Sequence, residues 1–178
     1  MSRTIPDRQS LPYRDCVGVA LFNKAGQVFI ARRIPGADPA DNSEFEAPWQ
    51  MPQGGIDKGE EPLPAAIREL YEETSVKSAK LLAEAPGWIY YDLPDDALGI
   101  ALKGKYRGQR QRWFAFLLEG DESEINVTEP GGGHSPEFDE WRWEDLENTP
   151  AIIVPFKRDA YVQVVKAFAA IPAQLRHG

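Results

Sequence analysis

An α/β fold, in which a mixed β-sheet packs against a few helices, is the architecture that this 178-residue sequence predicts. Short runs of β-branched and aromatic residues alternate with segments whose apolar residues recur at three- and four-residue steps. The first pattern is typical of strands, and the second is typical of helices that bury one face. A chain of this length is expected to form one domain with a full hydrophobic core.

The strand pattern occurs in six segments: 16–22, 27–33, 49–53, 88–92, 111–118 and 141–143. The first two are joined by the turn-like sequence Asn-Lys-Ala-Gly, which favours a hairpin. Residues 34–48 are rich in Pro, Asp and small residues, which indicates a long loop. Two roles are open for this loop: it covers a functional site, or it lies on the surface without a role in the site. The second is favoured.

Two segments carry the helical pattern. In residues 62–74, Pro62 suits the first turn because its missing N–H would have no partner there. The apolar residues of this segment form one stripe: Leu63, Ala66, Ile67 and Leu70. Residues 155–170 show a second stripe: Phe156, Val164, Val165 and Phe168. We expect one domain over 13–171, with a flexible N-terminal tail at 1–12 and a C-terminal tail at 172–178.

Composition excludes several classes of protein. The net charge of −8 argues against nonspecific binding of duplex nucleic acid, although five of the ten residues at 103–112 are basic. No run of 18 apolar residues is present, so no membrane span is expected. Cys16 is the sole cysteine, and the N-terminus lacks an apolar signal segment. A cytoplasmic setting is therefore expected.

Three carboxylates recur at helical spacing in the first helical segment. Glu69 lies three residues before Glu72 and four before Glu73, so the three share one helix face. At about 4 Å and an effective dielectric near 20, each such pair repels by roughly 4 kcal/mol. A hard divalent cation reverses that repulsion, with Mg²⁺ first and Mn²⁺ as a possible substitute. Arg68 is placed to hold a carboxylate through its forked guanidinium.

The segment that begins at Gly54 resembles the Nudix box. Six fixed positions match: one Gly, four Glu and one Arg. Chance gives such a match about once in 10⁷ windows, so the resemblance is strong. Ser75 stands where the family pattern has Gly, at a position expected to form the C-terminal turn of the helix.

The resemblance extends over about 13–171, through YRDCVGVALFN, PWQMPQGGID, GQRQRWFAFLL, EIN, PEFDEWRW and FKRDAY. Together these motifs are similar to a subgroup that holds bacterial RNA 5′-pyrophosphohydrolases and dinucleoside polyphosphate hydrolases. The resemblance implies the Nudix fold, an α/β/α sandwich with a mixed sheet and a signature loop-helix-loop. It also implies Mg²⁺-dependent hydrolysis within a nucleoside 5′-polyphosphate. Triphosphorylated RNA and diadenosine tetraphosphate, which would give ATP and AMP, both remain open as substrates.

Carried over by position, the resemblance assigns metal binding to five residues: the Gly54 carbonyl, Glu69, Glu72, Glu73 and Glu137. It assigns the chemistry to Glu69, Glu73 and Glu137, with either Glu73 or Glu137 as the general base. Asp139 and Glu140 are alternatives to Glu137. Glu60 and Arg68 are expected to be structural members of the motif.

The resemblance also indicates substrate-binding residues. Four cations are candidates for phosphate binding: Arg14, Arg32, Arg33 and Lys157. Tyr91 and Phe156 are candidates for a purine sandwich, because aromatic rings stack on bases. Two other functions are alternatives: hydrolysis of another nucleoside diphosphate derivative, and binding without catalysis. The presence of all four signature glutamates and Arg68 disfavours a non-catalytic module. The number of metal ions and the oligomeric state remain open.

Overall fold

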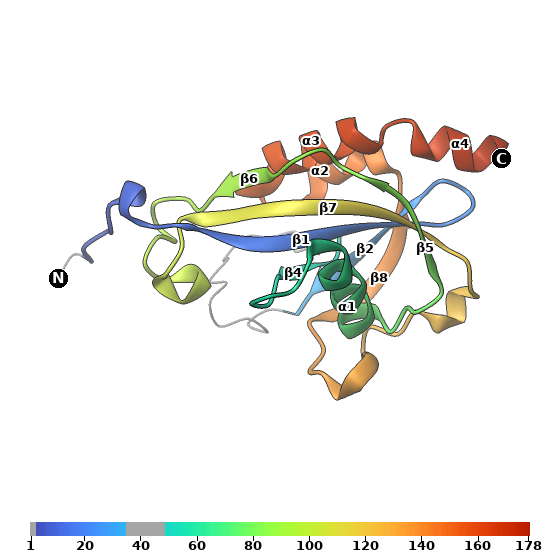
Figure 1. Cartoon of the computed structure of the whole chain (residues 1–178), viewed down its shortest axis with the longest axis horizontal. Coiled ribbons are helices and arrows are strands. Elements are labelled where there is room, and N and C mark those ends of the chain that lie inside the picture. The colour runs from blue at the N-terminus through green and yellow to red at the C-terminus, as the bar shows by residue number, and fades with distance from the viewer. Residues whose placement is uncertain (1–2, 35–48) are drawn as a thin grey trace.

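A computed structural model describes residues 3–34 and 49–178. The described residues form one eight-stranded mixed sheet with helices on both faces (Figure 1). The expected α/β fold is therefore confirmed, including the layered arrangement of a sheet between helices.

The strands are β1 (Tyr13–Phe22), β2 (Val28–Arg33), β3 (Trp49–Gln50), β4 (Gln53–Gly55), β5 (Ala79–Glu84), β6 (Ile89–Asp92), β7 (Gly108–Leu118) and β8 (Phe138–Glu144). The helices are α1 (Pro62–Thr74), α2 (Thr149–Ile152), α3 (Arg158–Phe168) and α4 (Ile171–His177). Short 3₁₀ turns include η1 (Arg8–Ser10), η2 (Ala101–Gly104), η4 (Gly131–Gly133) and η6 (Pro155–Lys157).

The sheet has the strand order β3-β2-β1-β7-β5, and β8, β4 and β6 add to β2, β1 and β7 respectively. β1 and β7 run parallel, whereas the other pairs are antiparallel. In the β1–β7 register, Arg14 lies opposite Gln109 and Cys16 lies opposite Gln111. This register brings polar residues from distant parts of the sequence to the same end of the sheet.

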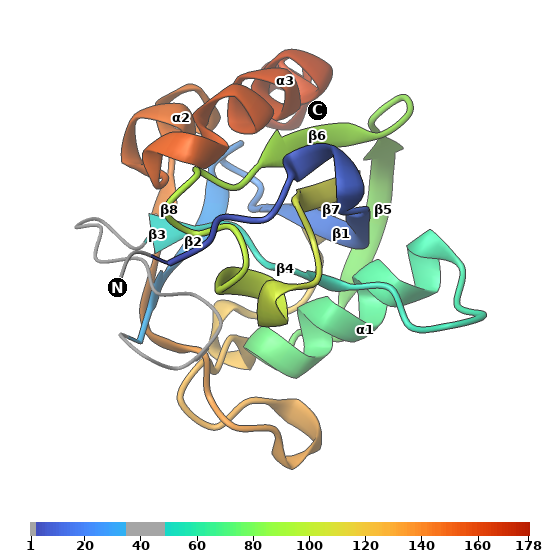
Figure 2. The same ribbon diagram turned by 90° about the vertical axis from the view of Figure 1, so that its left-hand side faces the viewer.

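Two apolar cores lie on the two faces of the sheet. One face packs against α1 through residues that include Val19 and Leu70. The other packs against α3 through residues that include Trp113 and Tyr161. Figure 2 shows the sheet between α1 on one side and α2 and α3 on the other. Gly18 is required beneath Trp113, because a Cβ atom there would lie 2.3 Å from the indole ring.

Each of the six expected strands is found, with two differences. The segment 49–53 is divided into β3 and β4 at Met51 and Pro52, because Pro52 has no N–H to donate to a ladder. β5 was not expected, because its sequence AKLLAE lacks strict alternation and its side chains are half-buried or exposed at the sheet edge. The hairpin between β1 and β2 is present.

The signature helix is found at 62–74, and Ser75 ends it with a left-handed φ of 69°. The predicted helix 155–170 consists of η6 followed by α3. None of the helices in the described ranges is long and apolar enough to cross a membrane. Most of the predicted loop at 34–48 lies outside the described residues, which resume at residue 49. Its position over a site or on the surface therefore stays a prediction.

Both predicted tails are attached to the domain where the structure describes them. Arg3 donates to the carbonyl of Asp96 at 2.9 Å, and Arg8 donates to the carboxylate of Asp95 at 2.8 Å. Of residues 172–178, expected as a C-terminal tail, 172–177 form α4 together with Ile171, and Gly178 follows the helix. Ile171 and Leu175, one helical turn apart, pack against the core, which explains why this segment is ordered as a helix.

Candidate functional site

A pocket of about 370 Å³ opens where β1, β4, β7 and α1 approach η2 and η6. Its lining combines carboxylates with cations and aromatic rings. Its lining includes Arg14, Arg33, Gln53, Gly54, Glu69, Tyr91, Gln109, Glu137, Phe156 and Lys157. All of these except Gln53 and Gln109 were predicted from the sequence as metal or substrate ligands, Gly54 through its backbone.

The Gly54 backbone lies against the Glu69 carboxyl group. A Cβ atom built on Gly54 would lie 2.1 Å from Cδ of Glu69, so only glycine fits beside this acid. Burial raises the pKa of Glu69 to about 7, although the neighbouring Arg68 cation opposes this shift. The loop and the helix thus bring two of the expected metal ligands into contact.

Glu73 is the most enclosed acid of the site, with 3% of its surface exposed. Burial raises its pKa well above the usual value, and the nearby carboxylates of Glu137 and Glu69 raise it further. The Gln53 backbone N–H donates to Glu73, but Oε2 of Glu73 has no hydrogen-bond partner among the described residues. A buried, unpartnered carboxylate oxygen is costly unless a ligand such as a cation satisfies it.

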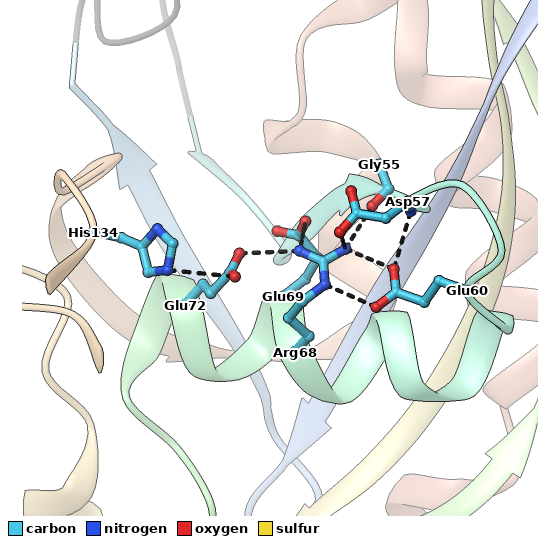
Figure 3. A network of polar contacts seen from close by, with 7 residues as sticks. All are labelled: Gly55, Asp57, Glu60, Arg68, Glu69, Glu72 and His134. Carbon is cyan, nitrogen blue, oxygen red and sulfur yellow. Dashed lines mark hydrogen bonds and ion pairs between the residues drawn. The ribbon is translucent and has the colours of Figure 1, made fainter. Parts of the chain in front are cut away.

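Arg68 holds the acids around it in a fixed arrangement (Figure 3). It binds Glu60 through two hydrogen bonds, both 2.9 Å long, and donates to the Gly55 carbonyl at 2.9 Å. Its Nη1 contacts Glu69 at 2.9 Å and Glu72 at 3.1 Å. The Arg68 guanidinium in turn lowers the pKa of Glu60. These contacts fit the structural role that the motif predicts for Glu60 and Arg68, which is to hold the loop and the helix together.

A loop containing η4 approaches α1 from the side of Glu72. His134 Nε2 lies 3.4 Å from Oε1 of Glu72. Glu137 follows in the same loop, and its backbone carbonyl accepts a hydrogen bond from the Ile34 N–H at 2.9 Å. A second hollow, of about 300 Å³, is lined by Glu69, Glu72, Glu73, His134, Ser135 and Glu137. Acids from the helix and from the loop therefore face one space.

The donor set fits a hard divalent cation. Within 3–34 and 49–178, no three acidic, His or Cys side chains are gathered into a ready-made metal cluster. Arg68 engages one oxygen each of Glu69 and Glu72 in this arrangement. Carboxylate oxygens are nevertheless the ligands that Mg²⁺ prefers, and Oε2 of Glu73 is free to bind. A bound cation would also relieve the mutual repulsion of Glu69, Glu73 and Glu137.

The same pocket is also lined by the substrate-binding candidates Arg14, Arg33, Lys157, Tyr91 and Phe156. The centroids of Tyr91 and Phe156 are 5.7 Å apart, with an interplanar angle of 46°. A base between two parallel rings needs about 7 Å, because each stacked layer takes roughly 3.5 Å. The expected sandwich is therefore not formed in this conformation. The two rings instead contact each other as one wall.

Arg32 lies outside the pocket, contrary to expectation. Its Nε contacts Asp139 Oδ1 at 2.8 Å, and its Nη1 contacts Glu140 Oε2 at 3.3 Å. The side chains of all three residues are substantially exposed. A shift in the β2–β8 register between Arg32 and Arg33 accompanies this separation of two neighbouring arginines. The pairing also engages the two alternatives to Glu137.

The basic cluster at 103–112 contains three arginines, one just before β7 and two within it, and each pairs with a carboxylate. The pairs are Arg107 with Asp92, Arg110 with Asp15, and Arg112 with Glu84. The sequence interpretation did not single out Gln53 and Gln109, which line the pocket. The signal was the alternation Gln-Arg-Gln-Arg in β7, which places the glutamines on the face opposite the arginines.

Comparisons with known proteins agree with this geometry. Residues 12–164 match the NUDIX domain. An RNA pyrophosphohydrolase from Rhizobium meliloti is 58% identical over 164 residues, which cover 90% of this chain and 96% of that protein. The chain therefore belongs to the Nudix family. The predicted class, a hydrolase acting on acid anhydrides of phosphorus-containing compounds, is confirmed.

Solved structures share the fold. A Caenorhabditis elegans Ap4A hydrolase in a binary complex has a TM-score of 0.57 at 18% identity, covering 88% of this chain and 98% of that chain. A bifunctional NMN adenylyltransferase/ADP ribose pyrophosphatase from Francisella tularensis, complexed with AMP and a Mn ion, has a TM-score of 0.53 at 16% identity. It covers 88% of this chain and 42% of that chain. At these identities the likeness concerns the fold alone.

Proposed function

We propose that this protein removes pyrophosphate from the 5′-triphosphate end of RNA. The observation that carries the proposal is one pocket lined both by carboxylates and by three cations, Arg14, Arg33 and Lys157. The relative named RNA pyrophosphohydrolase, similar over nearly the whole chain, favours RNA over other polyphosphates.

Mg²⁺ is the proposed cofactor, and Mn²⁺ is a possible substitute. Nudix enzymes generally use divalent metal ions. Glu69, Glu72, Glu73, Glu137 and the Gly54 carbonyl are the residues that would hold the ions. When bound, they would neutralise phosphate charge and lower the pKa of a water molecule.

The residues of the chain divide the remaining work. Arg14, Arg33 and Lys157 hold the phosphate oxygens of the substrate by charge and hydrogen bonds. Glu73 or Glu137 accepts the proton of the attacking water. Water attacks phosphorus in line with the leaving oxygen. The products are a 5′-monophosphate RNA end and pyrophosphate.

Diadenosine tetraphosphate is the second candidate substrate. YRDCVGV and WQMPQGGID, in the motifs quoted above, lean toward enzymes that cleave it. Its hydrolysis to ATP and AMP would use the same acids and cations. A cytoplasmic setting and the lack of nonspecific duplex binding remain predictions.

One experiment separates these functions. The purified protein with Mg²⁺ is given triphosphorylated RNA, diadenosine tetraphosphate or ADP-ribose at equal concentrations, and the initial rates are compared. The proposal expects the highest kcat/KM on RNA, with pyrophosphate released. Faster cleavage of either other substrate would overturn the choice of RNA. Binding of all three substrates without any product would instead identify a non-catalytic module.

A further inference from the structure

Trp113 fixes the orientation of a buried glutamine beside the pocket. Its indole is fully buried, and Nε1 lies 2.9 Å from Oε1 of Gln111. An indole N–H can only donate, so the atom of Gln111 that faces it must be the carbonyl oxygen. The amide of Gln111, which a flip would otherwise leave ambiguous, therefore has one defined orientation.

Gln111 passes this orientation to two further amides. Its Nε2 donates to Oε1 of Gln109 at 2.9 Å and to Oε1 of Gln53 at 3.0 Å. Both N–H groups of Gln111 are thereby used, and its side chain is 1% exposed. Reversing Gln111 would set N–H against N–H at Trp113, which would leave a buried donor unsatisfied.

Gln53 and Gln109 therefore present their Nε2 donors rather than their oxygens. Neither Nε2 has a protein hydrogen-bond partner among the described residues, and both side chains line the pocket. Gln53 precedes Gly54, and its backbone N–H binds Glu73. Gln109 lies between Arg14 and Tyr91 in the registers of β1, β7 and β6. Gln53 thus lies next to an acid of the site, and Gln109 lies next to a candidate phosphate-binding cation.

We infer that Gln111 is a positioning residue that, held by Trp113, makes Gln53 and Gln109 a fixed pair of donors for the nonbridging phosphate oxygens of the substrate. The inference rests on the proposed function. An ionised phosphate chain offers only acceptors, so an amide held with its N–H₂ toward the chain binds it without first having to turn. An amide held the other way would place an oxygen against the anion.

Gln111→Glu tests this orientation with a side chain of the same shape. The ionised carboxylate of this variant still accepts from Trp113 but cannot donate, so Gln53 and Gln109 would turn their Nε2 atoms toward it and their oxygens toward the pocket. At pH 8 we expect KM for triphosphorylated RNA to rise at least tenfold, with kcat changed less than threefold. Thermal melting checks that the variant is folded.

A second variant background separates the effect of the added charge on KM from the effect of amide orientation. In Gln53→Met/Gln109→Met, no amide remains to turn, so adding Gln111→Glu should raise KM by less than about twofold. An equal increase in both backgrounds would attribute the effect to charge alone and overturn the inference. If Gln111→Glu does not raise KM in the wild-type background, the inference is also overturned. If Gln111→Glu does not fold, Gln111→Met replaces it, with an expected increase of about threefold in the wild-type background only.

Calorimetric binding of inorganic pyrophosphate with Mg²⁺ separates this inference from the proposed function. The same set of variants should weaken pyrophosphate binding in the same order, whether or not the protein cleaves RNA. Unchanged pyrophosphate affinity in Gln111→Glu would contradict the donor pair even in an active enzyme. Wild-type protein that binds pyrophosphate but leaves RNA intact would instead contradict the proposed function.

Discussion

The Glu69 carboxyl group and the Gly54 backbone are in direct contact, with space for no atom between them. A Cβ at position 54 would lie 2.1 Å from Cδ of Glu69 and 2.2 Å from Oε2. Glu69 is also held by Arg68, so it has little freedom to move aside. The glycine of the loop therefore sets the position of an acid on the helix.

Gly54→Ala should displace Glu69 and lower kcat by about a hundredfold, the order expected when a reacting group moves by about 1 Å. The Mg²⁺ concentration for half-maximal activity should rise as well. Steady-state kinetics across a Mg²⁺ titration measure both changes.

The neighbouring Gly55 supplies a matched control. A Cβ on Gly55 would meet the Arg14 guanidinium at 2.4 Å rather than an acid. Gly55→Ala should therefore raise KM more than it lowers kcat. If the two variants show the same kinetic pattern, the contact between Gly54 and Glu69 has no particular role in the chemistry.

Glu73→Gln should reduce turnover by several orders of magnitude and make the metal-free protein more stable. Glu73 is buried beside two other acids, and its raised pKa means that its charge is unfavourable in the folded state. Each unit of such a shift corresponds to about 1.4 kcal/mol. A gain of about 1 kcal/mol raises Tm by about 2–4 °C in a chain of this size. Melting curves in EDTA at pH 8 test the gain.

Stability of the metal-free protein should fall as pH rises through neutrality. The folded-state pKa of Glu69, about 7, lies above its ordinary value of 4.5. A group of this kind binds its proton more tightly in the folded state, so its stabilisation is complete below about pH 4.5 and is lost as pH passes 7. The difference in Tm between wild type and Glu69→Gln should therefore change between pH 5 and pH 8, with wild type losing more.

Mg²⁺ should oppose that loss, because a cation favours the ionised acids. Repeating the two melting series with Mg²⁺ provides the control. A wild-type Tm that falls no more than that of Glu69→Gln in EDTA would be inconsistent with the raised pKa.

Arg68→Lys should lower the free energy of unfolding by about 1–2 kcal/mol, after allowance for the partial exposure of the guanidinium. Lysine cannot reproduce the two parallel hydrogen bonds to Glu60 together with those to Glu69 and Glu72. Arg32→Lys is the control, because Arg32 makes an exposed contact with Asp139 at 2.8 Å. Urea unfolding that gives equal losses for both variants would show that the Arg68 network adds nothing beyond a surface pair.

The part of the site carried by α1 was predictable because local spacing fixes it. Glu69, Glu72 and Glu73 share a helix face whatever the rest of the chain does, and Ser75 occupies the left-handed turn that the family pattern implies. β1 was predictable for a similar reason, since its apolar residues are buried on both faces of the sheet.

Features that depend on pairing between distant segments were not predictable. Gln111 meets Gln53 across 58 residues of sequence, and only the register of the sheet brings them together. Likewise, local spacing gives no sign of the irregularity between Arg32 and Arg33. Both arginines were therefore assigned to the phosphates, although the structure places only Arg33 at the pocket.

Arg32 and Arg33 together supply the sharpest test of the predicted phosphate-binding cations. Arg33→Ala should raise KM for triphosphorylated RNA at least tenfold, since one charge-assisted contact contributes about 1.5–3 kcal/mol and about 1.4 kcal/mol is one factor of ten. The effect on kcat should stay below about threefold. Arg32→Ala should leave KM within about twofold, because Arg32 pairs with Asp139 on the exposed side of the strand. Steady-state kinetics of wild type and both variants at one Mg²⁺ concentration measure these changes. If Arg33→Ala has the same KM as wild type, Arg33 does not bind the substrate. A large increase in KM for Arg32→Ala would place the phosphates on the other side of β2.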